Sequence, residues 1–199
     1  MDTYQNKIAL VTGASTGIGR AMAIDLAAKG AELILTARSK EQLDALAKEI
    51  QGKGGMAHVF VEDLAQPGSG ERLHQQVLAA GLHVDVLINN AGNAHGLSFI
   101  QDGDTDDWDA MLDINVQGLL YVSRAILPTM IERNTGFIVN IGSPAGIEVS
   151  PNGNVYCASK SAVEAINRNL LFNGIPKSEC IGNLGDATTV MYNHRSREK

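Results

Sequence analysis

The sequence predicts an α/β fold, with a doubly wound parallel β-sheet, helices on both faces and a single domain. Short apolar runs rich in β-branched residues alternate with longer segments of helical period, which is the order of a parallel sheet covered by helices. A glycine-rich turn follows directly after the first apolar run. The length of 199 residues suits one domain and does not require a second.

Strands and helices are expected to alternate as five βα units. The strand-like runs are "KIALVT" (7–12), "ELILTA" (32–37), "MAHVFV" (56–61), "VDVLIN" (84–89) and "GFIVNI" (136–141). The spacing of apolar residues predicts helices at 17–29, 40–51, 70–80 and 107–132, and a last helix that starts around Asn154. Glycine tolerates the left-handed angles that end helices, and Gly30, Gly52 and Gly136 lie where helices are expected to end.

The composition excludes several classes of function. A content of 44 % hydrophobic and 19 % charged residues is typical of a globular protein, and no apolar run approaches the roughly 20 residues of a membrane span. The start, "MDTYQNKIALVTG", lacks the features of an export signal, so a cytoplasmic protein is expected. A formal net charge of −6 argues against a nucleic-acid partner, because phosphate binding needs clustered Lys and Arg.

Neither a metal site nor a redox site is expected. The two cysteines, Cys157 and Cys180, are too few for a disulfide framework and lack the spacing of a zinc or redox motif. The histidines show no ligand spacing, so surface or packing roles are the favoured interpretation. They are His58, His74, His83, His95 and His194.

The glycine turn has the pattern of a phosphate cradle in a Rossmann-like fold. "TGASTGIG" (12–19) lies between a predicted strand and a predicted helix, which is the context in which such a turn binds a dinucleotide. Gly13 permits the sharp turn, Gly17 lets the backbone approach a pyrophosphate, and Gly19 allows close packing of the helix on the strand. Packing alone is the alternative explanation. Dinucleotide binding is favoured, and the predicted contacts are Gly13, Ser15, Thr16, Gly17, Ile18 and Gly19.

The end of the second strand bears on which nicotinamide cofactor is bound. An acid there would hold the ribose 2′-hydroxyl of NAD, whereas an arginine would accept the 2′-phosphate of NADP. The sequence is "LTARSK", with Arg38 and no Asp or Glu. NADP is therefore predicted, because Arg38 can make a forked, charge-assisted contact to phosphate. The alternative is that Arg38 only ends the strand in solvent.

Two later strands end in polar residues that are expected to face the same crevice. They are followed by "NNAG" (89–92) and "NIGS" (140–143), and ligands bind beyond the carboxyl ends of parallel strands. Ser143 is thus placed where a substrate can lie, and Gly92 allows close approach of the backbone. Asn115 lies within the predicted helix 107–132, where asparagine is an indifferent helix former, so a locally bonded polar residue is an equal interpretation.

Tyr156 and Lys160 are candidates for proton transfer. In "VYCASK" (155–160) they lie four residues apart, which is about one helical turn, so the side chains share a face. An ammonium group next to a phenol favours the ionised phenol, which can then exchange a proton with a carbonyl oxygen. Hydroxyl donors from Tyr156 and Ser143 would stabilise the charge that builds on that oxygen. Two ordinary helix-surface residues are the alternative, and only the other motifs favour chemistry.

Together these motifs resemble the short-chain dehydrogenase/reductase family of single-domain NAD(P)-dependent oxidoreductases. The matching residues are "TGASTGIG" (12–19), Asp63 in "VEDL", "NNAG" (89–92), Asn115, Ser143 and "YCASK" (156–160). The resemblance implies that Tyr156 is the acid/base, while Lys160 favours its ionised form and holds the nicotinamide ribose. Ser143 would orient the carbonyl and Asn115 would order a proton-relay water. The remaining implied cofactor contacts are Asp63, Leu64, Asn90, Ala91 and Gly92.

The resemblance also implies a reaction and an assembly. The reaction is the interconversion of a carbonyl and a secondary alcohol on a small-molecule substrate with NADP, and the assembly is a homodimer or homotetramer. "ERNTGFIVNIGS" and "GNVYCASK" look most like NADP-dependent dehydrogenases of serine and other small 3-hydroxy acids.

After Asn169 the resemblance stops. No run rich in β-branched residues is visible between 170 and 199, so the sixth strand and substrate-covering loop of the family are not expected. The prediction is a catalytic NAD(P)-binding domain over 1–170 and an atypical tail over 171–199, a candidate for partial disorder. A missing sixth strand would leave an exposed sheet edge. The alternative function is a truncated or catalytically weak NADP-binding protein that acts through dimerisation.

Overall fold

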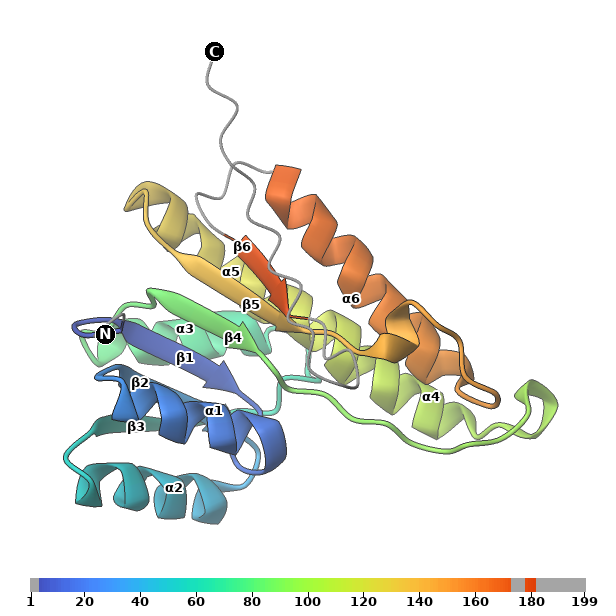
Figure 1. Cartoon of the computed structure of the whole chain (residues 1–199), viewed down its shortest axis with the longest axis horizontal. Helices are drawn as coiled ribbons and strands as arrows, with labels where there is room; N and C mark the ends of the chain where they lie inside the picture. Colours follow the sequence, from blue (N-terminus) through green and yellow to red (C-terminus); the bar gives the residue numbers. More distant parts are fainter. Residues whose placement is uncertain (1–3, 173–177, 182–199) are drawn as a thin grey trace.

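One parallel sheet of six strands forms the centre of the molecule (Figure 1). The strand order is β3-β2-β1-β4-β5-β6, and each neighbouring pair is parallel. The computed structural model describes residues 4–172 and 178–181. The order reverses between β1 and β4, which confirms the predicted doubly wound α/β fold. The strands are β1 (Ile8–Thr12), β2 (Glu32–Ala37), β3 (Met56–Val61), β4 (Val86–Asn89), β5 (Phe137–Ile141) and β6 (Ser178–Ile181).

Helices cover both faces of the sheet. The main ones are α1 (Gly17–Ala28), α2 (Lys40–Gly52), α3 (Ser69–Ala79), α4 (Thr105–Leu112), α5 (Leu119–Glu132) and α6 (Asn154–Phe172). The first three predicted helices end within one residue of their observed bounds, and α6 begins where it was predicted. In the part of the chain that the structure describes, no helix is long and apolar enough to cross a membrane, and no three potential ligand side chains are grouped to hold a metal ion.

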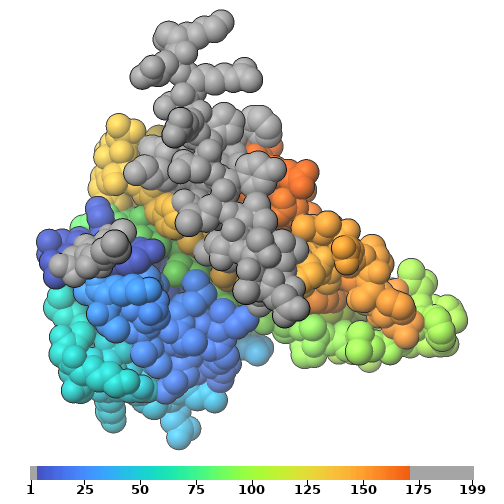
Figure 2. All heavy atoms as spheres, in the orientation of Figure 1, coloured from blue at the N-terminus to red at the C-terminus, as the bar shows by residue number. Residues whose placement is uncertain are grey.

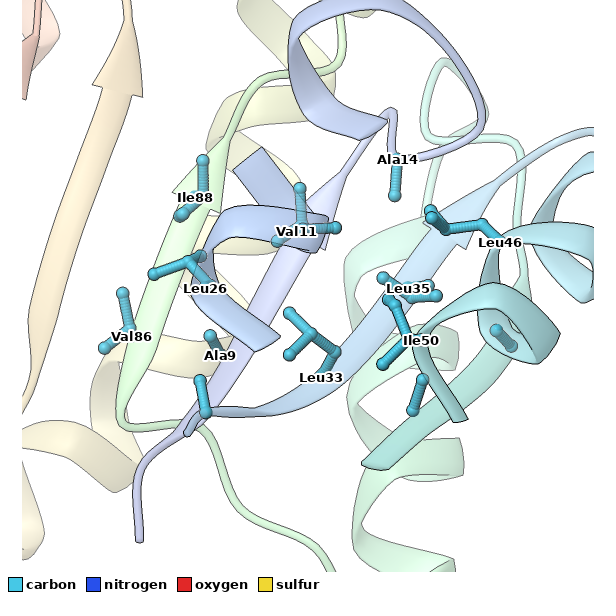
Figure 3. Packing of buried hydrophobic residues seen from close by; sticks show 14 of the residues in the cluster. Ala9, Val11, Ala14, Leu26, Leu33, Leu35, Leu46, Ile50, Val86 and Ile88 are labelled. Atoms are coloured by element: carbon cyan, nitrogen blue, oxygen red, sulfur yellow. The ribbon is translucent and has the colours of Figure 1, made fainter. Parts of the chain in front are cut away.

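Two separate layers of apolar side chains hold the helices to the sheet. In one layer, α1 and α2 pack on β1, β2 and β4 through residues such as Leu26, Leu46 and Leu33, all buried (Figure 3). In the other, α3, α5 and α6 pack on the opposite face around Leu10 and Leu87. Successive strand residues point to opposite faces, so apolar runs such as Ile8–Thr12 serve both layers at once.

The single helix predicted for 107–132 is wrong in one respect. The segment Asp113–Gly118 between α4 and α5 is π-helical, so the two helices are joined by a wider turn. Asn115 lies inside it with its side chain bonded outside the helix, and π-helical turns often occur at functional sites. Apolar spacing did not reveal the change, because the period still resembles that of one long helix.

The prediction that no sixth strand follows is also wrong. α6 continues past Asn169 to Phe172, and β6 pairs in parallel with β5, from Ile138 opposite Ser178 to Ile141 opposite Ile181. A short strand pairs through its backbone, so "SECI" needs no β-branched run to join the sheet. The edge of β5 is therefore covered. The rest of the predicted tail, 173–177 and 182–199, lies outside the described residues.

A buried carboxylate fastens the amino ends of the strands. Asp85, 6 % exposed, lies just before β4. Its oxygens accept hydrogen bonds from the backbone N–H of Ile8 at 3.0 Å and from the guanidinium of Arg133 at 2.9 Å. Arg133, which follows α5, also donates to the carbonyl of Val84. Asp85, Ile8 and Arg133 thus join two strands and the end of α5 at the amino ends of the strands, opposite the glycine turn.

Candidate active site

An open cleft of about 780 Å³ lies at the carboxyl ends of the strands. It extends from Arg38, after β2, past the glycine turn to the space between β5 and α6. Most of the predicted site residues line it. They are Gly13, Ser15, Thr16, Gly17, Ile18, Arg38, Asp63, Leu64, Asn90, Ala91, Gly92, Ser143, Tyr156 and Lys160.

The glycine turn leaves the start of α1 open to the cleft. Gly13 and Gly17 have φ of +63° and +55°, which disfavours any residue with a side chain. Within 4 Å of the place where a Cβ on Gly17 would stand there is no other atom, so that side of the turn is free. Thr16 makes no capping hydrogen bond to the first N–H groups of α1. These unbonded donors and the positive helix end fit the pyrophosphate of a dinucleotide.

Gly19 does not line the cleft and has a packing role. A Cβ on Gly19 would collide with the carbonyl of Gly13 and the side chain of Asn90. The amide of Asn90 donates to the carbonyl oxygens of Thr12 and Gly13, at 2.9 and 3.2 Å. The turn is thereby held to the end of β4.

Thr12 is a positioning residue that the predicted site did not include. Its hydroxyl donates to the carbonyl of Ile88 and accepts from the N–H groups of Asn90 and Ala91, at 3.2, 2.9 and 3.0 Å. The side chain is 1 % exposed. Its place at the last position of β1, directly before the glycine turn, was the available sequence signal.

Arg38 lies exposed at the far end of the cleft, next to Ser39. Among residues 4–170, whose side chains the structure describes, its guanidinium has no carboxylate partner. The nearby Glu62 also lines the cleft but is already paired with Arg72. An unpaired guanidinium at this end fits a 2′-phosphate.

Tyr156, Ser143 and Lys160 line the other end of the cleft. Tyr156 is half-buried and comes from the first turn of α6, while Ser143 follows β5. The ammonium of Lys160, on the next turn of α6, donates to the carbonyl of Ile141 at 2.9 Å. Lys160 is 8 % exposed, so its charge is held in a fixed place beside Tyr156.

Comparison with known proteins identifies the family. The family model for short chain dehydrogenases matches residues 7–178. The chain is a member of the short-chain dehydrogenase family. An uncharacterized oxidoreductase of Staphylococcus saprophyticus is 38 % identical over 171 residues, which are 85 % of this chain and 73 % of that protein. One from Staphylococcus aureus (strain MRSA252) is 34 % identical over 204 residues, covering 100 % of this chain and 87 % of the relative.

Solved structures of related oxidoreductases have the same fold. A metagenomic short-chain oxidoreductase in complex with NADP superposes with a TM-score of 0.84 at 33 % identity, covering 89 % of this chain and 82 % of that one. Serine dehydrogenase from Escherichia coli gives a TM-score of 0.82 at 36 % identity, with 88 % of this chain and 82 % of that one covered.

In this short-chain dehydrogenase, Asn115 lies behind the cleft and does not line it. The side chain is 2 % exposed. Its oxygen accepts from the N–H of Asn93 at 2.8 Å, and its amide donates to the carbonyl of Asn93 at 2.9 Å and to the hydroxyl of Ser159 at 3.0 Å. Ser159 in turn donates to the carbonyl of Tyr156. Asn115 therefore links the loop after β4 to the helix turn that carries Tyr156.

The bonded position of Asn115 leaves no room for a side chain at Gly92. A Cβ on Gly92 would stand 2.8 Å from the oxygen of Asn115. Sequence reasoning found Gly92 and Asn115 but missed their partners Asn93 and Ser159. The path of the loop brings Asn93 to Asn115, and the packing of α6 against the π-helical segment brings Ser159 there, 44 positions after Asn115.

A second polar link fixes α6 to the sheet of the dehydrogenase. The amide of Asn89 donates to the oxygen of Asn140 at 2.9 Å and to the hydroxyl of Ser123 at 3.0 Å. Asn140 donates to the oxygen of Asn167 at 3.0 Å. All four side chains are buried. Lys160 is bonded to the carbonyl of Ile141, the residue after Asn140. Two residues of α6 that lie about two helical turns apart, Lys160 and Asn167, are therefore bonded to two consecutive residues of β5.

Proposed function

We propose that this short-chain dehydrogenase is an NADP-dependent oxidoreductase that interconverts a carbonyl and a secondary alcohol by hydride transfer. One observation carries the proposal. Tyr156, Ser143 and Lys160 line the same cleft as the glycine turn, although they lie more than a hundred residues after it. Residues suited to proton transfer and residues suited to a dinucleotide thus face one continuous space.

The chain offers contacts for each part of the cofactor. The start of α1 would hold the pyrophosphate, and Arg38 the 2′-phosphate. Asp63 and Leu64 would contact the adenine, with Asn90, Ala91 and Gly92 along the middle of the cleft and Lys160 on the nicotinamide ribose. The bound cofactor would supply or accept hydride.

The protein's own part in the reaction is to move and stabilise a proton. In the reducing direction the hydroxyl of Tyr156 would donate its proton to the carbonyl oxygen, where negative charge develops. The hydroxyl of Ser143 would donate a hydrogen bond to the same oxygen. Lys160, held at the carbonyl of Ile141, would favour the ionised Tyr156 that the transfer leaves behind. Asn115 would hold a proton-relay water close to this turn of α6.

NADP is proposed over NAD because the unpaired Arg38 suits a phosphate and similar structures contain NADP. Titration of both cofactors tests this choice. We expect NADP to bind about tenfold or more tightly, the effect of a charge-assisted contact. Tighter binding of NAD would contradict the assignment.

Replacement of the phenol tests the reaction. We expect Tyr156→Phe to lower kcat/KM for NADPH oxidation with a panel of ketones by about 10²–10⁴-fold while NADP still binds. Tyr121→Phe is the matched control, because the hydroxyl of Tyr121, on α5, donates to Gln117 in the π-helical segment, and Tyr121 lies outside the cleft. If NADP binds but no ketone is reduced, and Tyr156→Phe changes nothing, a binding protein that acts through dimerisation is the better conclusion.

The substrate and assembly are separate questions. The similarity to serine dehydrogenase makes small 3-hydroxy acids one hypothesis for the substrate. A homodimer or homotetramer is proposed from the family, and sedimentation of the protein with and without NADP would measure it.

A further inference from the structure

The loop that follows β4 forms part of the cleft wall and lies beside Tyr156. Asn93 and Ala94, near its start, line the cleft. The next two residues, His95 and Gly96, line a small recess together with Tyr156. The position of this loop therefore affects how a carbonyl compound can lie against the phenol.

Few contacts fix residues 94–103 of this loop. Its three large apolar side chains, each more than 60 % exposed, are Leu97, Phe99 and Ile100. Apolar packing therefore contributes little to the position of the loop. Within 4–170, where side chains are described, a single hydrogen bond joins residues 94–103 to another segment, and in it the amide of Asn154 donates to the carbonyl of Ser98 at 2.6 Å.

The loop is thus bonded to α6 on both sides of Tyr156. Asn154 is the first residue of α6 and lies two positions before Tyr156. Three positions after Tyr156, Ser159 is bonded to Asn115, which holds the start of the loop at Asn93. Figure 2 shows the loop, in light green, and the start of α6, in orange, together at one end of the molecule.

We propose that Asn154 is a positioning residue, which holds the loop after β4 beside Tyr156 and so prepares the site for the carbonyl compound. The inference rests on the proposed function and concerns the binding of its substrate. α6 is also held to β5 through Lys160 and Asn167. Loss of the Asn154 bond should therefore release the loop and leave Tyr156 in place, which raises KM for the carbonyl compound more than it lowers kcat.

Asn154→Asp tests this role, because it removes the donor and keeps the shape of the side chain. At about pH 7 the carboxylate would repel the carbonyl oxygen of Ser98. An acidic residue in the first turn favours a helix, so α6 should not be weakened. We expect KM for a ketone that the unaltered protein reduces to rise about five- to tenfold, the effect of one lost hydrogen bond. The values of kcat and of Kd for NADPH should stay within about twofold.

Asn152→Asp is the matched control. Asn152 lines the same recess, and its side chain makes no hydrogen bond within the described residues. Its φ of +61° is one that Asp adopts almost as readily as Asn. The same new charge in this position should leave KM within about twofold of the unaltered value, because no bond to the loop is lost.

A second measurement needs no turnover. Trp108, the single tryptophan, lines the recess together with Ser98 and Asn154. Release of the loop should open the recess, so quenching of the Trp108 fluorescence by acrylamide should increase in Asn154→Asp. In Asn152→Asp the quenching should match that of the unaltered protein.

The outcomes separate this inference from the proposed function. If the unaltered protein reduces no ketone, the proposed function fails and the inference fails with it. If the unaltered protein is active, the inference alone is overturned by any of three results. These are an unchanged KM in Asn154→Asp, an equal rise of KM in Asn152→Asp, or a loss of activity that a lower urea midpoint or weaker NADPH binding explains in full.

Discussion

The amino and carboxyl ends of the strands differ in how far the protein satisfies its own polar groups. At the amino ends of the strands, the buried Asp85 is bonded to the backbone of Ile8 and to Arg133. At the carboxyl ends, Arg38 has no charged partner among the described residues, and the first N–H groups of α1 have no side-chain cap. At the amino ends the polar groups bond to one another and stabilise the fold. At the carboxyl ends these polar groups have no partner within the described part of the protein and are available to a ligand. Substitutions at the amino ends should therefore change stability, and substitutions at the carboxyl ends should change binding or turnover.

The largest effect on stability is expected from Asp85→Ala. The change leaves the guanidinium of Arg133 and the N–H of Ile8 without their acceptor in a largely buried place. We expect the free energy of unfolding to fall by about 3 kcal/mol, measured by urea denaturation. NADP affinity of the folded fraction should not change, because the cleft lies at the opposite edge. Lost NADP binding at unchanged stability would contradict the comparison.

The control for that experiment is an exposed acid. Asp25 pairs with Lys29 on the surface of α1, and its side chain is 62 % exposed. Asp25→Ala should leave the urea midpoint almost unchanged, since exposed ion pairs contribute little.

A smaller effect, but on both properties, is expected from Asn115→Ala. Asn115 lies near the carboxyl ends of the strands, yet its side chain is bonded to Asn93 and Ser159 of the chain itself. Loss of these bonds should cost about 2 kcal/mol of stability and also lower kcat, because Ser159 is bonded to the turn that carries Tyr156. Urea denaturation and NADPH oxidation measure the two effects.

Gln117→Ala is the matched control for Asn115→Ala. Gln117 lies in the same π-helical segment but is exposed, so we expect a change below about 0.5 kcal/mol. If Asn115→Ala lowered stability without lowering kcat, Asn115 would belong with Asp85 as a purely structural residue.

The smallest expected effect is on the pH dependence of stability. Burial tends to raise the pKa of the Asp85 carboxyl, but the hydrogen bonds from Ile8 and Arg133 outweigh it and hold the pKa below its ordinary value. The contribution of Asp85 is therefore fully present above the unfolded pKa of about 3.9, and it is lost as the pH falls through the folded pKa. We expect stability to fall more steeply below about pH 4 in the unaltered protein than in Asp85→Asn. Equal slopes would remove Asp85 as the cause.

The site was predictable where its signal is local. The glycine turn, Arg38 and the Tyr156–Lys160 pair each depend on a spacing within a few residues, and the structure places all of them along the cleft. Asn115 was found as a residue type in a motif, but its partners were not.

By itself, the sequence determined the α/β order, the parallel sheet and the bounds of most helices, because these depend on the period of apolar residues along one segment. Only the tertiary structure decided that β6 joins the sheet, that Asp113–Gly118 is π-helical, and that Asp85 links the amino ends of the strands, opposite the cleft. Backbone pairing and buried hydrogen bonds join residues that are far apart in the chain, so no local pattern records them.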